Sequence, residues 1–417
     1  MRASPRTQMA LILLLALGLR LGWALYARPV PLSDYLEYRN LAAAILDHGA
    51  YGYPQPTAFR LPAYPLLLAL FMLVGRSDLW LSLVNVLLST AMCLAAAALA
   101  RRLFPGRAGV GRLAALACAL NPAFVFYSPL LASEHLFVLL MTAVLLLGLG
   151  ESAGRPRTVL AGLVWGAAAL TRGEALFYAP VVLGLFAWRG RRQGGWRAGV
   201  VTAGVVLLAA GGVIGPWWLR NRLVIGPGAG LATNSGMTFY EGHNPYHYGY
   251  RGDYKRPPFR DLGKLERQRL AWRLGLRYIR EHPAGLLHSI WQGTWRLWRP
   301  SRLPVYLSTR APPRPGDQTY PAKPLAGLRL FEALCLGGYV LLVLLALWSL
   351  RGWRRWPRTT LWLVGGVVFC NWLGYAVVFW GMSRYRFFVE LILCLVAAAA
   401  LAGRRVAGGL SRPAAGP

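Results

Sequence analysis

The sequence DLWLSLVNVLLSTAMCLAAAALA, residues 78–100, is apolar over its whole length apart from Asp78 and a few small polar side chains. A helix of about 20 mostly apolar residues is long enough to cross the hydrocarbon core of a bilayer. Comparable runs recur along this chain of 417 residues, of which 56% are hydrophobic. We therefore predict an all-α polytopic membrane protein.

About ten segments have the length and composition of a membrane span. They are 8–27, 78–100, 112–128, 133–150, 158–172, 174–189, 197–219, 328–350, 359–380 and 385–403. The apolar stretch 62–75 is shorter and contains Pro62 and Pro65, so we expect it to form an interfacial helix. The first run follows a short basic stretch without a clear small-residue cleavage site, which indicates a retained span and not a removed signal peptide.

Arginines alternate along the chain in a way that predicts the orientation of these spans. With the N-terminus inside, the inner segments are rich in arginine, as at Arg101, Arg102, Arg107 and Arg112, whereas the short outer segments hold fewer. Cytoplasmic loops of membrane proteins carry this excess of basic residues. We expect a multi-pass protein of a bacterial inner membrane, with both termini in the cytoplasm.

The same threading predicts a division of the chain into parts. The predicted parts are an N-terminal transmembrane catalytic module (1–219) with a first outer loop (28–77), an outer loop domain (220–327), C-terminal transmembrane helices (328–404) and a cytoplasmic tail (405–417). Periodic apolar residues predict one helix from Asp34 that Gly49 ends, and an amphipathic helix over 262–281 that His282-Pro283 ends.

Charge and cysteine usage argue against several classes of protein. The formal net charge of +31 is spread over the loops and forms no basic helix or stripe, so we expect no nucleic-acid partner. All five cysteines lie within apolar segments and show no zinc-type spacing, which argues against outer disulfides and structural zinc.

Several acids and arginines lie where apolar segments meet the predicted outer face, and they are the candidate site residues. Ionisable groups at membrane depth are costly and usually functional. Asp34 is either a carboxylate favourably placed at a helix N-terminus or a general base near a hydroxyl acceptor, with Glu37 as a second candidate. Arg60 either reaches lipid headgroups or binds a phosphate.

The remaining candidates have similar alternatives. Glu134 is an N-terminal acid of a span or an acid that orients a sugar or holds a cation. Arg172 and Glu174 separate two short apolar runs, either as a mutual ion pair or with the arginine offered to a phosphate. Arg384, Tyr385 and Arg386 stand at the start of the last span, where such residues are also common anchors.

A divalent cation is possible in the outer loop domain, where an acid and two histidines lie close together in sequence. Glu241, His243 and His247 lack the spacing of a typical ligand set, so we predict no metal site there. We expect no other cofactor.

Short motifs in a defined order resemble the bacterial membrane glycosyltransferases of family 39, which have the type C fold (GT-C) and include protein O-mannosyltransferases and lipid A aminoarabinose transferases. The matching pieces are Asp34, Tyr38, Ala42 and Gly49; Arg60-Leu61-Pro62-Ala63-Tyr64-Pro65; Asn121-Pro122; Ser133-Glu134; Leu170-Thr171-Arg172; Trp218-Leu219-Arg220-Asn221; Thr233-Asn234-Ser235-Gly236; His243-Asn244-Pro245; His282-Pro283; and Arg384-Tyr385-Arg386.

The resemblance implies a sugar donor on a polyprenyl phosphate, used at the outer face of the membrane. It implies that Asp34 is the catalytic base, that Arg60 and Arg172 meet the lipid phosphate, and that Glu134 is an acidic position of the second outer loop. Further predicted substrate-binding residues are Glu174, Arg384, Tyr385, Arg386, Tyr64, His243 and Asn244. Many relatives carry paired acids where this chain has Asp34-Tyr35, and aminoarabinose transferases have an acid at the position of Phe59.

The predicted function is therefore an inverting glycosyltransferase that acts on a glycan, lipid or protein acceptor in contact with membrane lipid. A transporter or lipid flippase is the alternative, and an inactive scaffold whose outer domain binds a partner is a third. Transporters usually show repeated halves with broken helices at the midplane. No such repeat is present, and the charged candidates gather at one predicted face.

Overall fold

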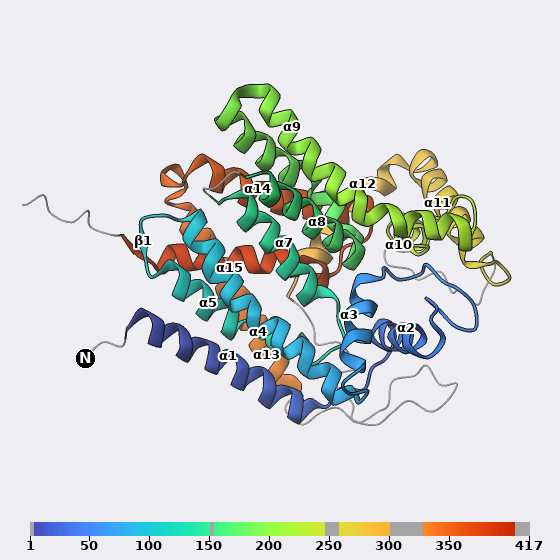
Figure 1. Cartoon of the computed structure of the whole chain (residues 1–417), viewed down its shortest axis with the longest axis horizontal. Helices are drawn as coiled ribbons and strands as arrows, with labels where there is room; N and C mark the ends of the chain where they lie inside the picture. Colours follow the sequence, from blue (N-terminus) through green and yellow to red (C-terminus); the bar gives the residue numbers. More distant parts are fainter. Residues whose placement is uncertain (1–3, 151–153, 247–257, 301–327, 405–417) are drawn as a thin grey trace, which may run out of the picture.

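The computed structural model describes residues 4–150, 154–246, 258–300 and 328–404. Within these residues the fold is helical apart from one pair of two-residue strands. His247 and the tail 405–417, named above, lie outside the described residues. Figure 1 shows the helices as a bundle with a second, smaller group of helices packed at one end.

The N-terminal part of the chain forms most of the bundle. Its helices are α1 (Pro5–Ala27), α2 (Asp34–His48), α3 (Ala63–Met72), α4 (Asp78–Leu103), α5 (Val110–Leu120), α6 (Pro122–Tyr127), α7 (Glu134–Gly148), α8 (Arg155–Thr171), η1 (Gly173–Tyr178) and α9 (Ala179–Val224). Gly49 ends α2 in the left-handed conformation, as predicted, but the Ser33 side chain makes no capping hydrogen bond to the backbone of this helix.

Two helices of the bundle differ from the expected spans for local reasons. The predicted span 112–128 is divided, because Pro122 cannot continue α5 and the Asn121 side chain accepts hydrogen bonds from the first amides of α6. Within α9 the backbone leaves the helical conformation at Gly194 and Gly195. Gly190 packs on Ala198 and Gly199, so the chain folds back on itself there and forms the two predicted spans 174–189 and 197–219 as antiparallel arms.

Five helical stretches are long and apolar enough to cross a membrane by length and composition. They are Pro5–Ala27, Asp78–Leu103, Gly173–Val224, Ala333–Leu350 and Arg358–Val378. The fold is therefore that of an all-helical membrane protein. Several predicted spans appear instead as apolar helices of 10–17 residues, among them α5 and α7, so the number of about ten stays a prediction. The expected interfacial segment 62–75 is the ten-residue helix α3.

The C-terminal part returns to the bundle. It consists of α13 (Leu328–Leu350), η3 (Trp353–Arg355), α14 (Arg358–Trp372), a π-helical turn η4 (Leu373–Val378), η5 (Ser383–Arg386) and α15 (Phe387–Leu401). Helix α15 is buried along nearly its whole length, in contact with α4, α5, α7 and α13. This explains its uniformly apolar sequence, since a helix with neighbours on all sides needs no polar face.

Segments predicted to face the cytoplasm meet at one end of the bundle. Strand β1 (Arg107–Ala108) pairs antiparallel with β2 (Gly403–Arg404). The Thr360 hydroxyl donates to the Leu103 carbonyl, and Trp356 packs edge-on against Phe104. Figure 1 places β1 at the end opposite α2 and α10. These contacts bring the segments around Arg107, Arg358 and Arg404 together, and the orientation of the bundle in the membrane stays a prediction.

Arg20 lies fully buried inside the bundle, where sequence reasoning gave it no role. Its guanidinium donates to the Ser89 hydroxyl (2.8 Å) and to the carbonyls of Ala16, Cys118 and Ala119 (3.0–3.1 Å). It thereby satisfies carbonyls that the end of α5 leaves without a helical partner. The guanidinium thus joins α1, α4 and α5, and its hydrogen bonds to protein groups take the place of solvation by water.

The outer loop domain supplies three described helices: α10 (Ser235–Gly242), α11 (Lys264–Glu281) and α12 (Pro283–Trp298). Helix α11 matches the predicted amphipathic helix, whereas α12 was not predicted. Glycines allow close packing here, because a Cβ on Gly236 would overlap the backbone carbonyl of Gln268, and one on Gly242 would overlap that of Phe379. Helix α10 is thus packed tightly against α11 on one side and against the residue that follows η4 on the other.

Candidate active site

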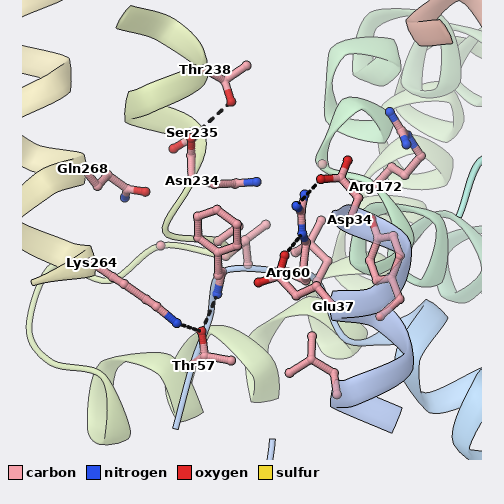
Figure 2. Close-up of a pocket in the computed structure, with 18 of the residues that line it drawn as sticks. Asp34, Glu37, Thr57, Arg60, Arg172, Asn234, Ser235, Thr238, Lys264 and Gln268 are labelled. Carbon is pink, nitrogen blue, oxygen red and sulfur yellow. Dashed lines mark hydrogen bonds and ion pairs between the residues drawn. The ribbon is translucent and has the colours of Figure 1, made fainter. Parts of the chain in front are cut away.

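A cavity of about 1010 Å³ lies where the outer helices meet the bundle. One wall comes from α2, the loop before α3, and η1, and the other comes from α10 and the start of α11 (Figure 2). Side chains from the segment after η4 close the remaining side. The loop 49–62 is held in position by Arg220, which donates to the carbonyls of Tyr51 and Thr57.

Asp34, the first residue of α2, lies in this cavity between two arginines. Its Oδ1 is 2.5 Å from Nη2 of Arg60, and its Oδ2 is 2.9 Å from Nη2 of Arg384. Glu37 lies one turn further on the same face of α2, and its Oε2 accepts from Nε of Arg60 at 2.7 Å. The carboxylate of Asp34 is therefore fixed at the cavity wall, with each oxygen facing one cation.

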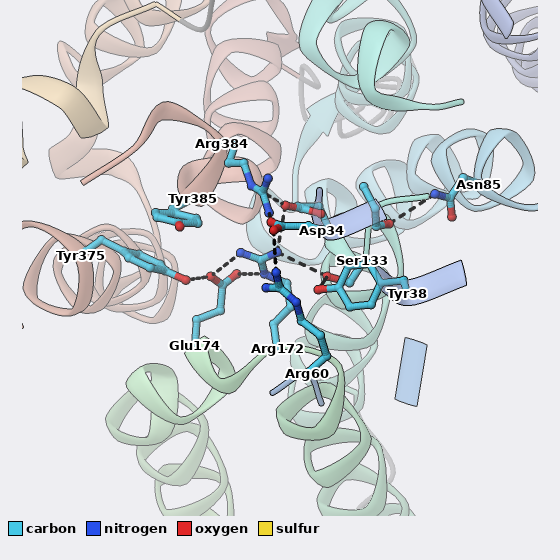
Figure 3. Close-up of polar contacts among 12 residues, drawn as sticks. Asp34, Tyr38, Arg60, Asn85, Ser133, Arg172, Glu174, Tyr375, Arg384 and Tyr385 are labelled. Carbon is cyan, nitrogen blue, oxygen red and sulfur yellow. Dashed lines mark hydrogen bonds and ion pairs between the residues drawn. The ribbon is translucent and has the colours of Figure 1, made fainter. Parts of the chain in front are cut away.

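Arg172 brings two further acids into the same cluster. It follows the last residue of α8 in an extended conformation, which turns its side chain toward the cavity. Its Nη1 is 2.8 Å from Oε1 of Glu134, and its Nε is 3.2 Å from Oε1 of Glu174. Glu134 also lies 3.1 Å from Nε of Arg384, so one buried carboxylate connects two arginines. Figure 3 shows Arg172 and Arg384 in this cluster, with Glu174 beside Arg172.

The ion-pair cluster joins five separate stretches of the chain, at 34–37, 60, 134, 172–174 and 384. Its members are Asp34, Glu37, Arg60, Glu134, Arg172, Glu174 and Arg384. Burial disfavours the charged form of Arg60, but Asp34 and Glu37 more than offset this and raise its pKa above the ordinary value. Arg60 is therefore a cation at any physiological pH.

Aromatic side chains flank the cluster on the η4–η5 side. Tyr385 stacks on Tyr375 with ring centroids 4.4 Å apart, and the Tyr375 hydroxyl donates to Glu174. The guanidinium groups of Arg172 and Arg384 lie 5.8 and 5.9 Å from the Tyr385 ring centroid. Tyr385 thus presents an aromatic face to two cations, a favourable electrostatic contact.

The predicted site residues divide into those that line the cavity and those that do not. Asp34, Glu37, Arg60, Arg172, Glu174, Arg384 and Tyr385 line it. Glu134 lies behind the lining and reaches the cavity through its two arginines.

Four predicted substrate-binding residues make structural contacts elsewhere. Arg386 is fully buried, pairs with Glu390 at 2.8 Å and donates to the carbonyls of Leu297 and Arg299. The arginine at this position is occupied in joining α12 to α15.

The other three lie behind the cavity wall. Tyr64 packs edge-on against Tyr38, with ring centroids 5.1 Å apart. The ring Nε2 of His243 is 3.1 Å from the carbonyls of Val377 and Val378, and Asn244 donates to the carbonyl of Tyr240 at 3.0 Å. Direct binding by these residues stays a prediction.

The second wall of the cavity and the loop before α3 hold polar residues that sequence reasoning did not assign to the site. They are Thr57, Asn234, Ser235, Thr238, Glu241, Lys264, Arg267 and Gln268. Asn234 and Ser235 belong to one of the matching motifs, which was their one signal in the sequence. The others lie in polar loop or amphipathic-helix sequence, where nothing distinguishes a lining residue from a solvated one.

The donor set of the cavity does not fit a resident divalent cation. Each acid of the ion-pair cluster already faces at least one guanidinium group, and these cations would repel a metal ion. Among the described residues, no group of three or more His, Cys, Asp or Glu side chains has the geometry of a metal site. The Nε2 atom of His243, which could otherwise ligate a metal, lies within hydrogen-bonding distance of the carbonyls of Val377 and Val378.

Comparison with known families agrees with this architecture. Residues 55–219 match the sequence model of the family described as dolichyl-phosphate-mannose-protein mannosyltransferase, which confirms the resemblance inferred from the motifs. The matched region contains Arg60, Glu134 and Arg172, whereas Asp34 precedes it. No curated protein sequence matches the chain.

Two solved structures of an archaeal oligosaccharyltransferase show the same fold. The apo oligosaccharyltransferase of Archaeoglobus fulgidus superposes with a TM-score of 0.53 at 15% identity, over 95% of this chain and 50% of that protein. The archaeal oligosaccharyltransferase AglB from Archaeoglobus fulgidus, in complex with an inhibitory peptide and a dolichol-phosphate, gives 0.53 at 14% identity over the same shares. ArnT from Cupriavidus metallidurans, bound to undecaprenyl phosphate, gives 0.45 at 15% identity, over 95% of this chain and 78% of that one.

This chain thus spans about half the length of the oligosaccharyltransferase whose fold it shares. The fold is GT-C-like, and its N-terminal part carries the sequence pattern of the mannosyltransferase family.

Proposed function

We propose that this chain is an inverting glycosyltransferase that moves a sugar from a polyprenyl-phosphate donor to a hydroxyl acceptor at the outer face of the membrane. One observation carries the proposal: Asp34 is held in a large cavity beside Arg60 and Arg384, with Arg172 in the same cluster. A carboxylate among several guanidinium groups is the arrangement that sugar transfer from a lipid phosphate requires. The family matched by residues 55–219 is named for such a donor.

The proposed reaction is a single displacement. The acceptor oxygen attacks the anomeric carbon while the bond from that carbon to the phosphate oxygen breaks, and the phosphate leaves with the electron pair. Asp34 takes the proton of the acceptor hydroxyl. Attack from the face opposite the leaving group inverts the anomeric centre, in analogy with single-step inverting glycosidases.

The arginines supply the electrostatic part of this chemistry. The leaving phosphate already carries charge, so it needs cations and no strong general acid. Each guanidinium offers five N–H donors in a planar fork, so Arg60, Arg172 and Arg384 can keep their carboxylates and still meet phosphate oxygens. Donors fixed in advance near a low-dielectric boundary stabilise the developing charge without reorganising.

The acids beside Asp34 have a supporting role in this scheme. Glu134 and Glu174 fix the orientation of Arg172, and Glu37 fixes that of Arg60. The dolichol-phosphate recorded with AglB, which shares this fold, supports a lipid phosphate as the ligand of the cluster. Because the cluster repels a metal ion, we expect chelators to leave the transfer rate unchanged.

The test is Asp34→Asn in a strain that depends on this chain for a surface glycan or glycoprotein. Mass spectrometry should show at least a ~100-fold loss of the glycosylated product, the size of a lost general base. Asp47→Asn is the matched control, because Asp47 lies on the same helix but pairs with Arg76 at the exposed surface. An Asp34→Asn strain with an unchanged product would refute the proposal and leave a transporter or scaffold.

A further inference from the structure

The second wall of the cavity is rich in neutral polar groups, beside the charged residues Glu241, Lys264 and Arg267, and so differs in chemistry from the ion-pair cluster. Asn234, Ser235, Thr238 and Gln268 supply neutral hydrogen-bonding groups from α10 and α11, opposite Asp34 and Arg60 (Figure 2). Short amides and hydroxyls in such a row suit a ligand with several hydroxyl groups, because each can donate or accept as needed. Nothing in the proposed displacement uses this wall.

Two of these side chains are directed at the cavity instead of at protein partners. Gln268 is only 8% exposed, yet its Oε1 has no hydrogen-bond partner within the described part of the chain. A buried polar atom without a partner is costly, which points to a ligand that completes it. Asn234 precedes α10 but makes no capping hydrogen bond, and Figure 2 shows its amide extending into the cavity.

Lys264 adds a positive charge to the same wall. Its Nζ donates to the Thr57 hydroxyl at 3.2 Å, and no carboxylate lies within ion-pair distance of it among the described residues. This distinguishes it from Arg60, Arg172 and Arg384, each of which already faces an acid. A compact ammonium group beside hydroxyl-binding side chains favours an anionic ligand group.

The wall is rigid enough to be a built site. Gly236 packs directly on the backbone of Gln268, and Gly242 packs on the backbone of Phe379, so α10 is fixed on both sides. The ring of Phe239 stacks on that of Trp272 with centroids 4.2 Å apart, which joins α10 to α11 behind the lining. Thr233 donates its amide to the Ala58 carbonyl and thereby links the wall to the loop that carries Arg60.

We propose that this wall binds the acceptor and that the acceptor is an acidic saccharide. Its hydroxyl groups meet Gln268 and Asn234, and its carboxylate or phosphate meets Lys264, which leaves one hydroxyl to face Asp34 across the cavity. The inference rests on the proposed function, since it assigns the donor phosphate to the arginines. It narrows the acceptor from a glycan, lipid or protein to an acidic sugar group.

The first test compares variants of the whole chain in the strain described above. Lys264→Met and Gln268→Leu should each lower the amount of product about tenfold, the loss that one strong hydrogen bond produces. Lys264→Arg keeps the charge and should retain most of the product, which a purely steric role would not predict. Arg273→Met removes an exposed cation from the same helix outside the cavity, and its product should stay within about twofold.

The product itself gives a second readout. Its mass spectrum should assign the transferred sugar to an acceptor that carries a carboxylate or phosphate on a saccharide. A neutral acceptor, or one attached through a protein side chain, would overturn the inference.

The third readout separates acceptor from donor. Purified full-length chain titrated with undecaprenyl phosphate should bind it with the same affinity in Lys264→Met as in the parent. A loss of that binding would assign Lys264 to the donor and overturn the inference. The failure of the proposed function would give a different result, because the Asp34→Asn variant would then still form the product. If only this inference fails, Asp34→Asn is inactive and Lys264→Met is fully active.

Discussion

At the scale of single residues, the cavity depends on how a few arginines are shared between acids. Arg60 contacts Asp34 and Glu37, while Arg172 contacts Glu134 and Glu174. Buried charges are tolerated only when they are paired, and removing one partner leaves the other uncompensated. The arginines therefore have two tasks, to hold the acids in place and to meet the ligand.

Replacing Arg60 should separate these two tasks. Arg60→Ala removes a phosphate donor and leaves Asp34 with one cation, so we expect at least a ~100-fold loss of transfer. Arg60→Lys keeps the charge but loses the planar fork, so we expect an intermediate loss. The measurement is the amount of glycosylated product, with the exposed Arg76→Ala as control. Equal activity in all three variants would remove Arg60 from the site.

The raised pKa of Arg60 gives an expectation for pH. A cation whose pKa is shifted upward stays protonated as the pH rises through the neutral and mildly alkaline range. Affinity for undecaprenyl phosphate should therefore not fall between about pH 7 and pH 9. A titration that shows binding lost in this window would mean that another group supplies the charge.

At the scale of helices, buried polar contacts fix the positions of neighbouring helices relative to one another, which apolar packing alone does not determine. Helices of similar composition can slide past one another in a membrane, because lipid and side chain are equally apolar. Arg20 prevents this by bonding carbonyls of both α1 and α5 and the Ser89 hydroxyl of α4.

Arg20→Met should therefore destabilise the bundle. The substitution leaves the carbonyls of Cys118 and Ala119 buried without their donor, at a cost of about 3 kcal/mol. Thermal unfolding of the purified chain in detergent is the measurement. Arg76→Met is the control, since its exposed ion pair with Asp47 contributes at most about 1 kcal/mol. Equal unfolding temperatures for the two variants would contradict this account.

The sequence predicted the helices better than it predicted their partners. The long apolar runs identified α1, α4 and α14 from composition alone, because spanning a bilayer demands a particular length. Helix α12 was missed, since its mixture of tryptophan, arginine and small residues has no simple apolar run. The second wall was missed for a related reason, because Lys264 and Gln268 sit on an amphipathic helix whose polar face looks solvated in sequence.

The sequence predicted which types of residue form the candidate site, but not which acid pairs with which arginine. That Asp34, Arg60, Arg172 and Arg384 would share one face followed from the spans, since each lies where an apolar segment ends. Which arginine pairs with which acid depends on how each helix is rotated and on the path of each loop. Neither can be deduced from a single sequence. For the same reason Arg386 was grouped with its neighbour Arg384, although the structure turns the two side chains toward different helices.

At the scale of the whole molecule, the predicted cytoplasmic loops and the first outer helix lie at opposite ends of the bundle. The segments around β1 and β2 are rich in arginine, whereas helix α2, which carries Asp34 and Glu37, lies at the opposite end (Figure 1). The threading assigns the arginine-rich end to the cytoplasm.

This orientation can be tested by labelling introduced cysteines. All five native cysteines are buried, so they give little background. We expect Asp47→Cys, on the exposed end of α2, to react with an impermeant maleimide in intact cells, and Arg101→Cys to react only after the cells are opened. Labelling in the reverse order would place the cavity on the cytoplasmic side and remove the proposed outer-face reaction.

The central claim is that Asp34 and three arginines surround one lipid-borne phosphate. The most direct measurement is a cryo-EM or crystal structure of the chain with undecaprenyl phosphate bound. We predict phosphate density in the cavity, within hydrogen-bonding distance of Arg60 and of Arg172 or Arg384, with the Asp34 carboxylate open to the remaining space. Phosphate density elsewhere, with the ion pairs of Asp34 unchanged, would contradict the account.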